Sequence, residues 1–336
     1  MEQLQTLEGP AIWSSDDFQS DGEWIYHFSE AAIADVDQAI KRIRDQSITL
    51  DDITADDFNL PALAEELQQM KQILADGRGF VMLKGLSVEK YSDQEFEIIL
   101  YGIGTHLGVG VSQSQLGDRI GQVKDVGGVG RYYTAGGPIE VHMDPVDITG
   151  LLCLRQAKTG GESWIMSAGN IHNLLLEENS EHLEVLYRGF HYGGTQGSNL
   201  SFRTPHRLPV FANSASGPVC FYLPKAILGW SDLPGSELDD IETEALEHLN
   251  GIAQRQQVYL KMDLQPGDIQ FLNNRKLLHA RSDYEDHPEP DRARHLLRLW
   301  LMAPEWPPLP EEMNFLPSTD RAGGGIAKGE AAEGNP

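Results

Sequence analysis

The sequence is poor in cysteine, in basic residues and in long apolar runs, and each shortage excludes a class of protein. Among 336 residues there are only two cysteines, Cys153 and Cys220, which is too few for a disulfide scaffold. Each lies in an apolar, strand-like run, so we expect two buried free thiols. Lysine and arginine total 26 against 51 acidic residues, which gives a formal net charge of -25. Such a surface repels nucleic acid and anionic membranes.

No segment reads as a membrane span or a secretory leader. No apolar run reaches the roughly 20 residues that cross a bilayer, and Met1 to Gln5 has no basic region followed by an apolar core. We therefore expect a cytoplasmic protein in a reducing compartment, with neither nucleic acid nor membrane as a partner. A homo-oligomer is left open.

The first part of the chain is mainly helical, and the rest is mainly strand. Apolar spacing predicts helices over 29–46 and 60–75, and a capping box, Ser92 to Glu95, opens a third that runs towards His106. A short buried strand at 79–83 precedes the third helix. Beyond about residue 110, turns separate short strand-like runs at 148–154, 163–167, 208–211, 219–223, 258–262, 268–272 and 294–302.

Many short strands separated by turns favour a sandwich or barrel. We expect a mainly β protein with flanking helices, in which residues 1–78 form a mainly helical segment packed on the core. Residues 79–310 would form the core domain, with helical insertions at about 170–188 and 237–254. Residues 320–336 are polar and rich in glycine, so we expect a disordered tail.

The most informative motif is His142-Met143-Asp144. Alternate residues of a strand share a face, so His142 and Asp144 would point the same way if residues 141–147 are extended. A distant histidine would complete a set of two histidines and one carboxylate, which suits Fe(II) used for oxygen chemistry. The best candidate is His279. Taken singly, the motif also reads as a solvated strand end, and His279 as a surface histidine in a loop.

A second cluster of informative residues lies near the end of the core. If residues 294–302 form a strand, Arg294, Arg298 and Trp300 share one face, and the alternate leucines face the core. Two arginines on an otherwise apolar strand are costly to bury unless they are paired. Arginine suits two-pronged recognition of a carboxylate. Salt bridges to the abundant acidic residues are an equal alternative for Arg298.

Together these segments resemble the iron(II)- and 2-oxoglutarate-dependent dioxygenases of the TauD/TfdA group, within the clavaminate-synthase-like superfamily. The resemblance runs from about Gly79 to Met302. The stretches that carry it are 79–86, 149–155 with Gly160-Gly161-Glu162-Ser163, 266–274, His279-Ala280-Arg281 and 294–301.

The resemblance implies a double-stranded β-helix, or jelly roll, with helices packed outside. It implies that His142, Asp144 and His279 bind Fe(II) and that Arg294 holds the distal carboxylate of 2-oxoglutarate. Arg298 would lie beside it, contacting either the cosubstrate or an acidic group on the substrate. Relatives often place a hydroxyl residue late in the strand after the double glycine to bind the cosubstrate. The best-matched position here is Gly169, and Ser167 is the substitute we expect.

The resemblance also implies a reaction. With O2 and 2-oxoglutarate consumed and succinate and CO2 released, a small-molecule substrate would be hydroxylated, desaturated or otherwise oxidised at a C–H bond. The substrate would be a carboxylate-bearing or specialised metabolite, and the enzyme would serve biosynthesis. Asp144 favours this chemistry over halogenation, because halogenating relatives replace this carboxylate with a small residue.

Two alternatives stay open. One is an iron oxidase or isomerase on the same fold that takes no 2-oxoglutarate, and the other is a non-catalytic jelly-roll binding protein. Further residues that could border the pocket are as readily explained by packing or exposure; these are His106, Gln113, Tyr132, Tyr133, Phe202 and Arg203.

Overall fold

The computed structural model of the chain describes residues 4–114, 116–125, 137–193, 203–215, 217–313 and 324–326. The predicted tail at 320–336 therefore lies outside the described residues, apart from 324–326. Within the described ranges no helix is long and apolar enough to cross a membrane. The α-helices are α1 (Glu30–Asp45), α2 (Ala64–Ala75), α3 (Asp93–Thr105), α4 (Ala168–Glu178), α5 (Ser180–Arg188), α6 (Pro224–Ser231) and α7 (Asp240–Ala253).

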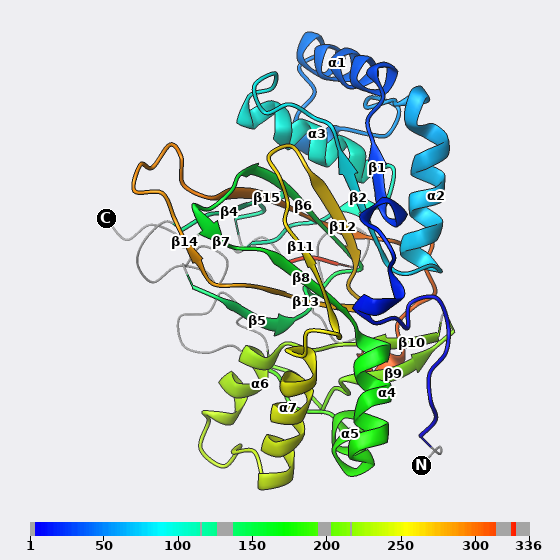
Figure 1. The fold of residues 1–336 in the computed structure, drawn as a ribbon, viewed down its shortest axis with the longest axis vertical. Coiled ribbons are helices and arrows are strands. Elements are labelled where there is room, and N and C mark those ends of the chain that lie inside the picture. The colour runs from blue at the N-terminus through cyan, green and yellow to red at the C-terminus, as the bar shows by residue number, and fades with distance from the viewer. Residues whose placement is uncertain are drawn as a thin grey trace.

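Two sheets dominate the architecture (Figure 1). The larger has the order β1-β2-β12-β6-β15-β3, with β4 also paired to β15, and the smaller has the order β11-β8-β13-β5. Only β1 and β2 pair in parallel among the described strands. The strands of the larger sheet are β1 (Ile25–His27), β2 (Phe80–Lys84), β3 (Val109–Gly110), β4 (Ile120–Val123), β6 (Ile148–Arg155), β12 (Ile269–Asn273) and β15 (His295–Met302).

The smaller sheet and two short two-stranded sheets contain the remaining described strands. The sheet contains β5 (Ile139–His142), β8 (Ser163–Ser167), β11 (Tyr259–Met262) and β13 (Leu277–Arg281). One two-stranded sheet pairs β9 (Phe211–Ser214) with β10 (Gly217–Cys220), and the other pairs β7 (Thr159–Gly160) with β14 (Tyr284–Glu285).

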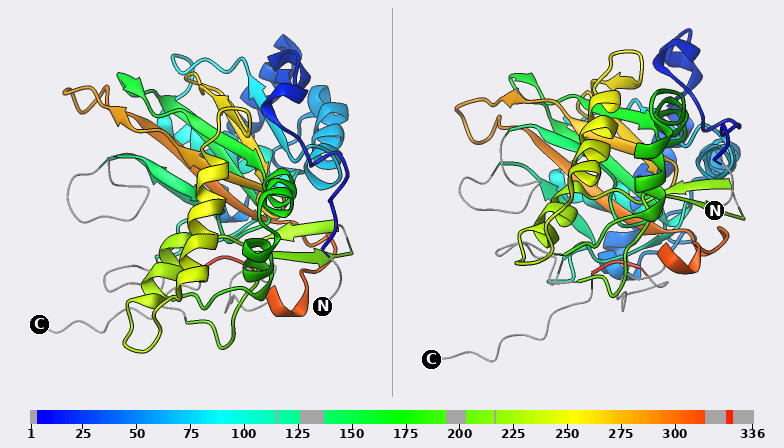
Figure 2. Two further views of the ribbon diagram at one scale, coloured as in Figure 1. Left: turned by 60° about the horizontal axis from the view of Figure 1, so that its bottom comes forward. Right: turned by 90° about the horizontal axis from the view of Figure 1, so that it is seen from below.

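The two sheets pack face to face between two layers of helices. Helices α1 to α3 cover the outer face of the larger sheet, where Val81, Leu152 and Leu299 belong to one apolar cluster. Helices α4, α5 and α7 cover the outer face of the smaller sheet, as the further views show (Figure 2). A third cluster, which includes Phe80 and Ile165, fills part of the space between the sheets. That inner space is where the candidate site lies.

Elements with strong local signals match the prediction closely. Ser29 caps α1, and the capping box of Ser92 and Glu95 opens α3, as the sequence predicts. The insertion predicted at 170–188 is two helices, because Asn179 leaves the helical conformation and its side chain then caps α5.

Three details of the strand prediction are wrong. The strand predicted at 208–211 begins only at Phe211, and the one predicted at 219–223 ends at Cys220, because Pro224 starts α6 soon afterwards. More importantly, β5 ends at His142, so the extended run predicted for 141–147 is not present as a strand. Asp144 therefore does not share a strand face with His142.

Candidate active site

The two histidines meet across neighbouring strands. His279 lies within β13, and the antiparallel register of β13 with β5 sets it directly opposite His142. Their ring centroids are 4.3 Å apart, which is the closeness expected of cross-strand partners. The alternative of a surface loop for His279 is wrong, because its side chain is only 12% exposed.

Asp144 reaches the histidine pair from the chain that leaves β5. Its Oδ2 lies 3.9 Å from Nε2 of His279. One ligand atom from each of His142, Asp144 and His279 lies within 4.8 Å of the others. The structure thus brings the three sequence-predicted residues together, although Asp144 arrives by a loop rather than on the strand.

The protonation states of the three side chains suit a metal. Burial lowers the pKa of both histidines, and that of His279 falls to about 3. Nδ1 of His142 donates to the carbonyl oxygen of Glu140 over 2.8 Å, so in the neutral ring Nε2 is the nitrogen that carries no proton. Burial alone would raise the pKa of Asp144, but Arg298 and the histidines hold it below its ordinary value. Two neutral imidazoles and one carboxylate form the donor set that Fe(II) oxygenases use.

Arg298 makes the salt bridge that the sequence left as one alternative, and its partner is Asp144. Nη1 of Arg298 donates to Oδ1 of Asp144 over 3.0 Å. Nε donates to Oε1 of Gln113 over 2.8 Å, and Nε2 of Gln113 donates back to the carbonyl oxygen of Arg298. The side chain of Arg298 is therefore held in a fixed orientation beside Asp144.

Arg294 is buried with part of its guanidinium unsatisfied. Nη2 donates to the carbonyl oxygen of Gly161 over 3.2 Å, and the group lies over the ring of Tyr284. Nη1 is buried and has no hydrogen-bond partner. Burial, followed by repulsion from Arg281, lowers the pKa of Arg294 to about 10. An orphaned donor on a buried cation fits a carboxylate ligand.

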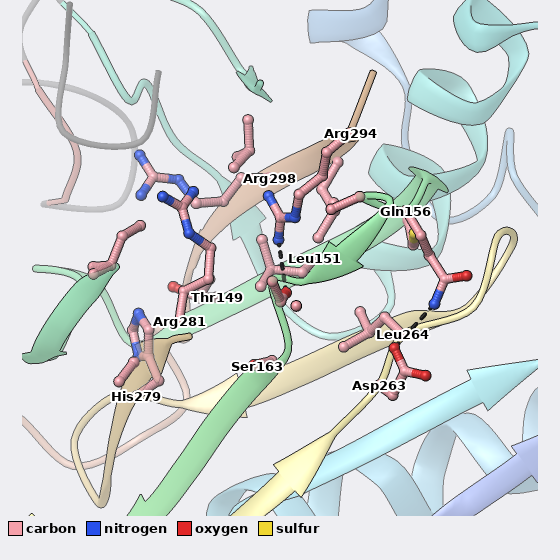
Figure 3. A pocket seen from close by; sticks show the side chains of 18 of the residues that line it. Thr149, Leu151, Gln156, Ser163, Asp263, Leu264, His279, Arg281, Arg294 and Arg298 are labelled. Atoms are coloured by element: carbon pink, nitrogen blue, oxygen red, sulfur yellow. Dashed lines mark hydrogen bonds between the residues drawn. The ribbon is translucent and has the colours of Figure 1, made fainter. Parts of the chain in front are cut away.

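One pocket between the sheets is lined by the three candidate ligands and by Arg294 and Arg298 (Figure 3). Arg298 and Arg281 reach in near His279, Arg294 lies midway, and Gln156 and Asp263 lie at the other end. The remaining lining includes Thr149, Leu151, Cys153, Ser163, Leu264 and Leu296. The pocket therefore runs from the candidate metal ligands past an unsatisfied guanidinium.

The double glycine forms the wall beside Arg294. Gly160 and Gly161 have positive φ angles of 73° and 78°, which side chains other than hydrogen rarely allow. A Cβ on Gly161 would lie 2.9 Å from Nε of Arg294. The turn thus admits the guanidinium because it carries no side chain.

Ser167 lies outside the pocket, and Ser163 of the same strand lines it. The hydroxyl of Ser167 donates to the carbonyl oxygen of Ala11 over 2.6 Å and caps α4 by accepting from the backbone N–H of Asn170. Ser167 does not line the pocket, whereas Ser163 does. Both residues share a face of β8, but four residues of strand separate them by roughly 13 Å. In the sequence, Ser163 is the hydroxyl residue that directly follows Gly160-Gly161-Glu162.

Among the further pocket candidates that the structure describes, Gln113 contacts a site residue, Arg298. Nε2 of His106 bonds the carbonyl of Phe58 instead, and Arg203 is exposed. Tyr132, Tyr133 and Phe202 lie outside the described residues. Sequence reasoning missed Arg281, Thr149 and Asn274, whose contacts become apparent only once the strands are paired.

Comparisons with known proteins agree with this geometry. The profile of a family described as "Taurine catabolism dioxygenase TauD, TfdA family" matches residues 44–300. FR-33289 synthase of Streptomyces rubellomurinus is 32% identical over 88% of this chain and 90% of its own. The taurine hydroxylase-like protein SAT17 of Stachybotrys chartarum is 27% identical over 89% of this chain and 80% of its own.

Solved structures share the fold at low identity. An asparagine oxygenase in complex with Fe(II), 3-hydroxyasparagine and succinate has a TM-score of 0.65 and 18% identity, covering 83% of this chain and 93% of that chain. The non-heme iron oxygenase OrfP in complex with Fe and alpha-ketoglutaric acid has a TM-score of 0.59 and 14% identity, over 83% and 94% of the two chains.

Proposed function

The chain belongs to the TauD/TfdA family of Fe(II)- and 2-oxoglutarate-dependent dioxygenases, and we propose that His142, Asp144 and His279 hold its iron. The observation that carries this proposal is the convergence of three ligand atoms within 4.8 Å in the pocket that also contains Arg294. We further propose that the two facing sheets form a jelly-roll core made mainly by residues 79–310. Residues 1–78 add β1 at one edge of the larger sheet and the helices that pack on the core.

Arg294 is the residue we assign to the distal carboxylate of 2-oxoglutarate. Its Nη1 is buried without a partner, and a carboxylate would satisfy it with a charge-assisted hydrogen bond. Ser163 faces the same pocket and donates to Oε1 of Gln270 over 3.2 Å, so its hydroxyl could turn to the same carboxylate. These two residues would fix the distal end of the cosubstrate midway along the pocket.

The residues of the chain bind and orient, while the bound groups carry the oxidation. Iron with 2-oxoglutarate and O2 would supply the oxidising power, with succinate and CO2 as coproducts. The two histidines remain neutral at pH 7 because their pKa values are lowered, so they can bind a cation without first losing a proton. Apolar walls, such as Leu151 and Leu296, exclude water from the reacting centre.

We propose that the substrate is a small molecule with an acidic group, and that the reaction is hydroxylation, desaturation or a related C–H oxidation in a biosynthetic pathway. Support comes from Arg298 and Arg281, which lie near His279 in the same pocket (Figure 3). Bound iron would partly neutralise the carboxylate of Asp144. The guanidinium of Arg298 beside it would then attract a second anion. An amino acid or another carboxylate-bearing metabolite has this chemistry.

The test is a two-step assay. Adding 2-oxoglutarate to the anaerobic Fe(II) protein should produce a charge-transfer band, and admitting O2 with a matching acid should raise succinate release above the uncoupled background. Small carboxylic acids would be compared with their neutral amides, and only the acids should stimulate. No band would favour an iron enzyme that takes no 2-oxoglutarate, and no oxygen consumption with any compound would favour a binding protein.

Alanine substitutions at the two serines of β8 should have different effects on cosubstrate affinity and on stability. Ser163→Ala should raise the Kd of 2-oxoglutarate roughly tenfold or more, because one hydrogen bond to a charged group is lost. Ser167→Ala should leave that Kd unchanged and lower the free energy of unfolding by about 1 kcal/mol, because α4 loses its cap. Titration of the charge-transfer band and urea denaturation measure the two effects. Weaker cosubstrate binding in Ser167→Ala alone would restore the sequence-based assignment.

A further inference from the structure

Three hydrogen bonds link Asp144, Asn274 and Thr149 in a closed ring. The backbone N–H of Asp144 donates to Oδ1 of Asn274 over 3.3 Å, and Nδ2 of Asn274 donates to Oγ1 of Thr149 over 2.7 Å. The hydroxyl of Thr149 then donates to Oδ2 of Asp144 over 3.0 Å. All three residues are buried.

The direction of every bond in this ring is fixed by chemistry. A carboxylate can only accept and a backbone N–H can only donate, so the ring has a defined start and end. The hydroxyl of Thr149 has one hydrogen, and because it accepts from Asn274 that hydrogen is given to Asp144. The amide of Asn274 is likewise fixed, with its oxygen towards the backbone of Asp144. The ring therefore has one arrangement.

The ring joins Asp144 to the larger sheet. Thr149 lies in β6, opposite Leu272 in β12, and Asn274 follows directly after β12. Asp144 itself belongs to the chain that leaves β5 of the smaller sheet. Because β5 ends before Asp144, the orientation of the carboxylate is set by the facing sheet and not by its own strand.

The second oxygen of Asp144 is held by a different group. Oδ1 accepts from Nη1 of Arg298 over 3.0 Å, and Gln113 fixes that guanidinium in turn. Oδ2, the oxygen that Thr149 contacts, is the one that lies 3.9 Å from Nε2 of His279. The two oxygens are thus distinguished, one towards the arginine and one towards the histidine.

We propose that Thr149, itself held by Asn274, is a positioning residue that turns Oδ2 of Asp144 towards the metal, while Arg298 keeps Oδ1 out of the coordination sphere. This inference rests on the proposed metal site. A carboxylate that bound through both oxygens would occupy one more position on the metal. Binding through one oxygen leaves the open positions that cosubstrate and O2 require.

The test replaces the hydroxyl and reads the metal directly. Thr149→Val keeps the shape but removes the donor, and Thr149→Ser restores the donor. We expect the Kd of Co(II) to rise tenfold or more in Thr149→Val, as for other residues that orient metal ligands. The intensity of the visible Co(II) band, which depends on coordination number, should also change. Thr149→Ser should return both quantities towards the wild-type values.

Thr105→Val is the matched control. Thr105 lies in α3, and its hydroxyl donates to the carbonyl oxygen of Gly102, away from the pocket. Its Co(II) affinity should equal that of the wild type. If Thr149→Val is too unstable to purify, Thr149→Cys provides a side chain of similar size with a weak donor, and its Kd should also exceed that of the wild type.

The outcomes separate this inference from the proposed function. Equal Co(II) affinity and spectrum in the wild type and Thr149→Val would overturn the role of Thr149 and leave the metal site intact. Equal weakening in Thr149→Val and Thr149→Ser would also overturn it, because the hydroxyl would not be the cause. A wild-type protein that binds no Co(II) would overturn the proposed function itself.

Discussion

Replacing His279 by alanine is expected to abolish metal binding and to lower turnover by roughly three orders of magnitude, the equivalent of several kcal/mol of lost transition-state stabilisation. His279 and His142 supply the two neutral nitrogens of the set, and their rings face each other across β13 and β5. With one ring gone, a single imidazole and Asp144 would be left to bind the ion. Metal content after dialysis and succinate release measure the two effects.

His27→Ala is the control for this variant. His27 is an exposed histidine in β1 of the larger sheet, so its loss should change neither metal content nor turnover. A His279→Ala protein that retained one equivalent of tightly bound iron would place the metal site elsewhere. Equal loss of metal in both variants would indicate a general effect of removing histidine.

Arg294→Met is expected to raise the Kd of 2-oxoglutarate roughly a hundredfold while leaving metal affinity unchanged. The guanidinium is buried and its Nη1 has no partner, so a bound carboxylate would gain charge-assisted hydrogen bonds that methionine cannot supply. Lysine at the same position should rescue only partly, because an ammonium lacks the planar pair of donors. Titration of the anaerobic Fe(II) protein with 2-oxoglutarate gives the Kd.

Arg292 provides the matched control two residues earlier. Its side chain is 60% exposed and faces Glu289 at 3.8 Å, so Arg292→Met should leave the Kd of 2-oxoglutarate as it is. Wild-type cosubstrate affinity in Arg294→Met would mean that the distal carboxylate is held by another group. The alternative of an iron enzyme without 2-oxoglutarate would then gain support.

The sequence indicated which residues would meet, but part of the reasoning behind that prediction was wrong. His142 and Asp144 were expected to share a strand face, yet β5 ends at His142. Both residues still lie beside His279. The chain after β5 brings Asp144 against the larger sheet, where Thr149 and Arg298 donate hydrogen bonds to its carboxylate. A two-residue spacing alone cannot reveal contacts that depend on strands far along the chain.

Local signals predicted helices better than strands. Caps such as Ser29 and Ser92 mark helix starts through contacts within a few residues, so α1 and α3 begin where expected. By contrast, β13 is a short run with a histidine at its centre, and only its pairing with β5 and β8 makes it a strand. The same dependence on pairing explains why the sequence alone does not show that Ser163, rather than Ser167, lines the pocket.

The bare turn at Gly160-Gly161 limits how this enzyme could be redesigned. A side chain at Gly160 would run into the backbone of Asp283, and one at Gly161 would strike Arg294. Substitutions at these two glycines therefore cannot be used to make the protein accept a longer or shorter 2-oxo acid. Variation would have to come from other residues that line the pocket, such as Cys153 or Ser163.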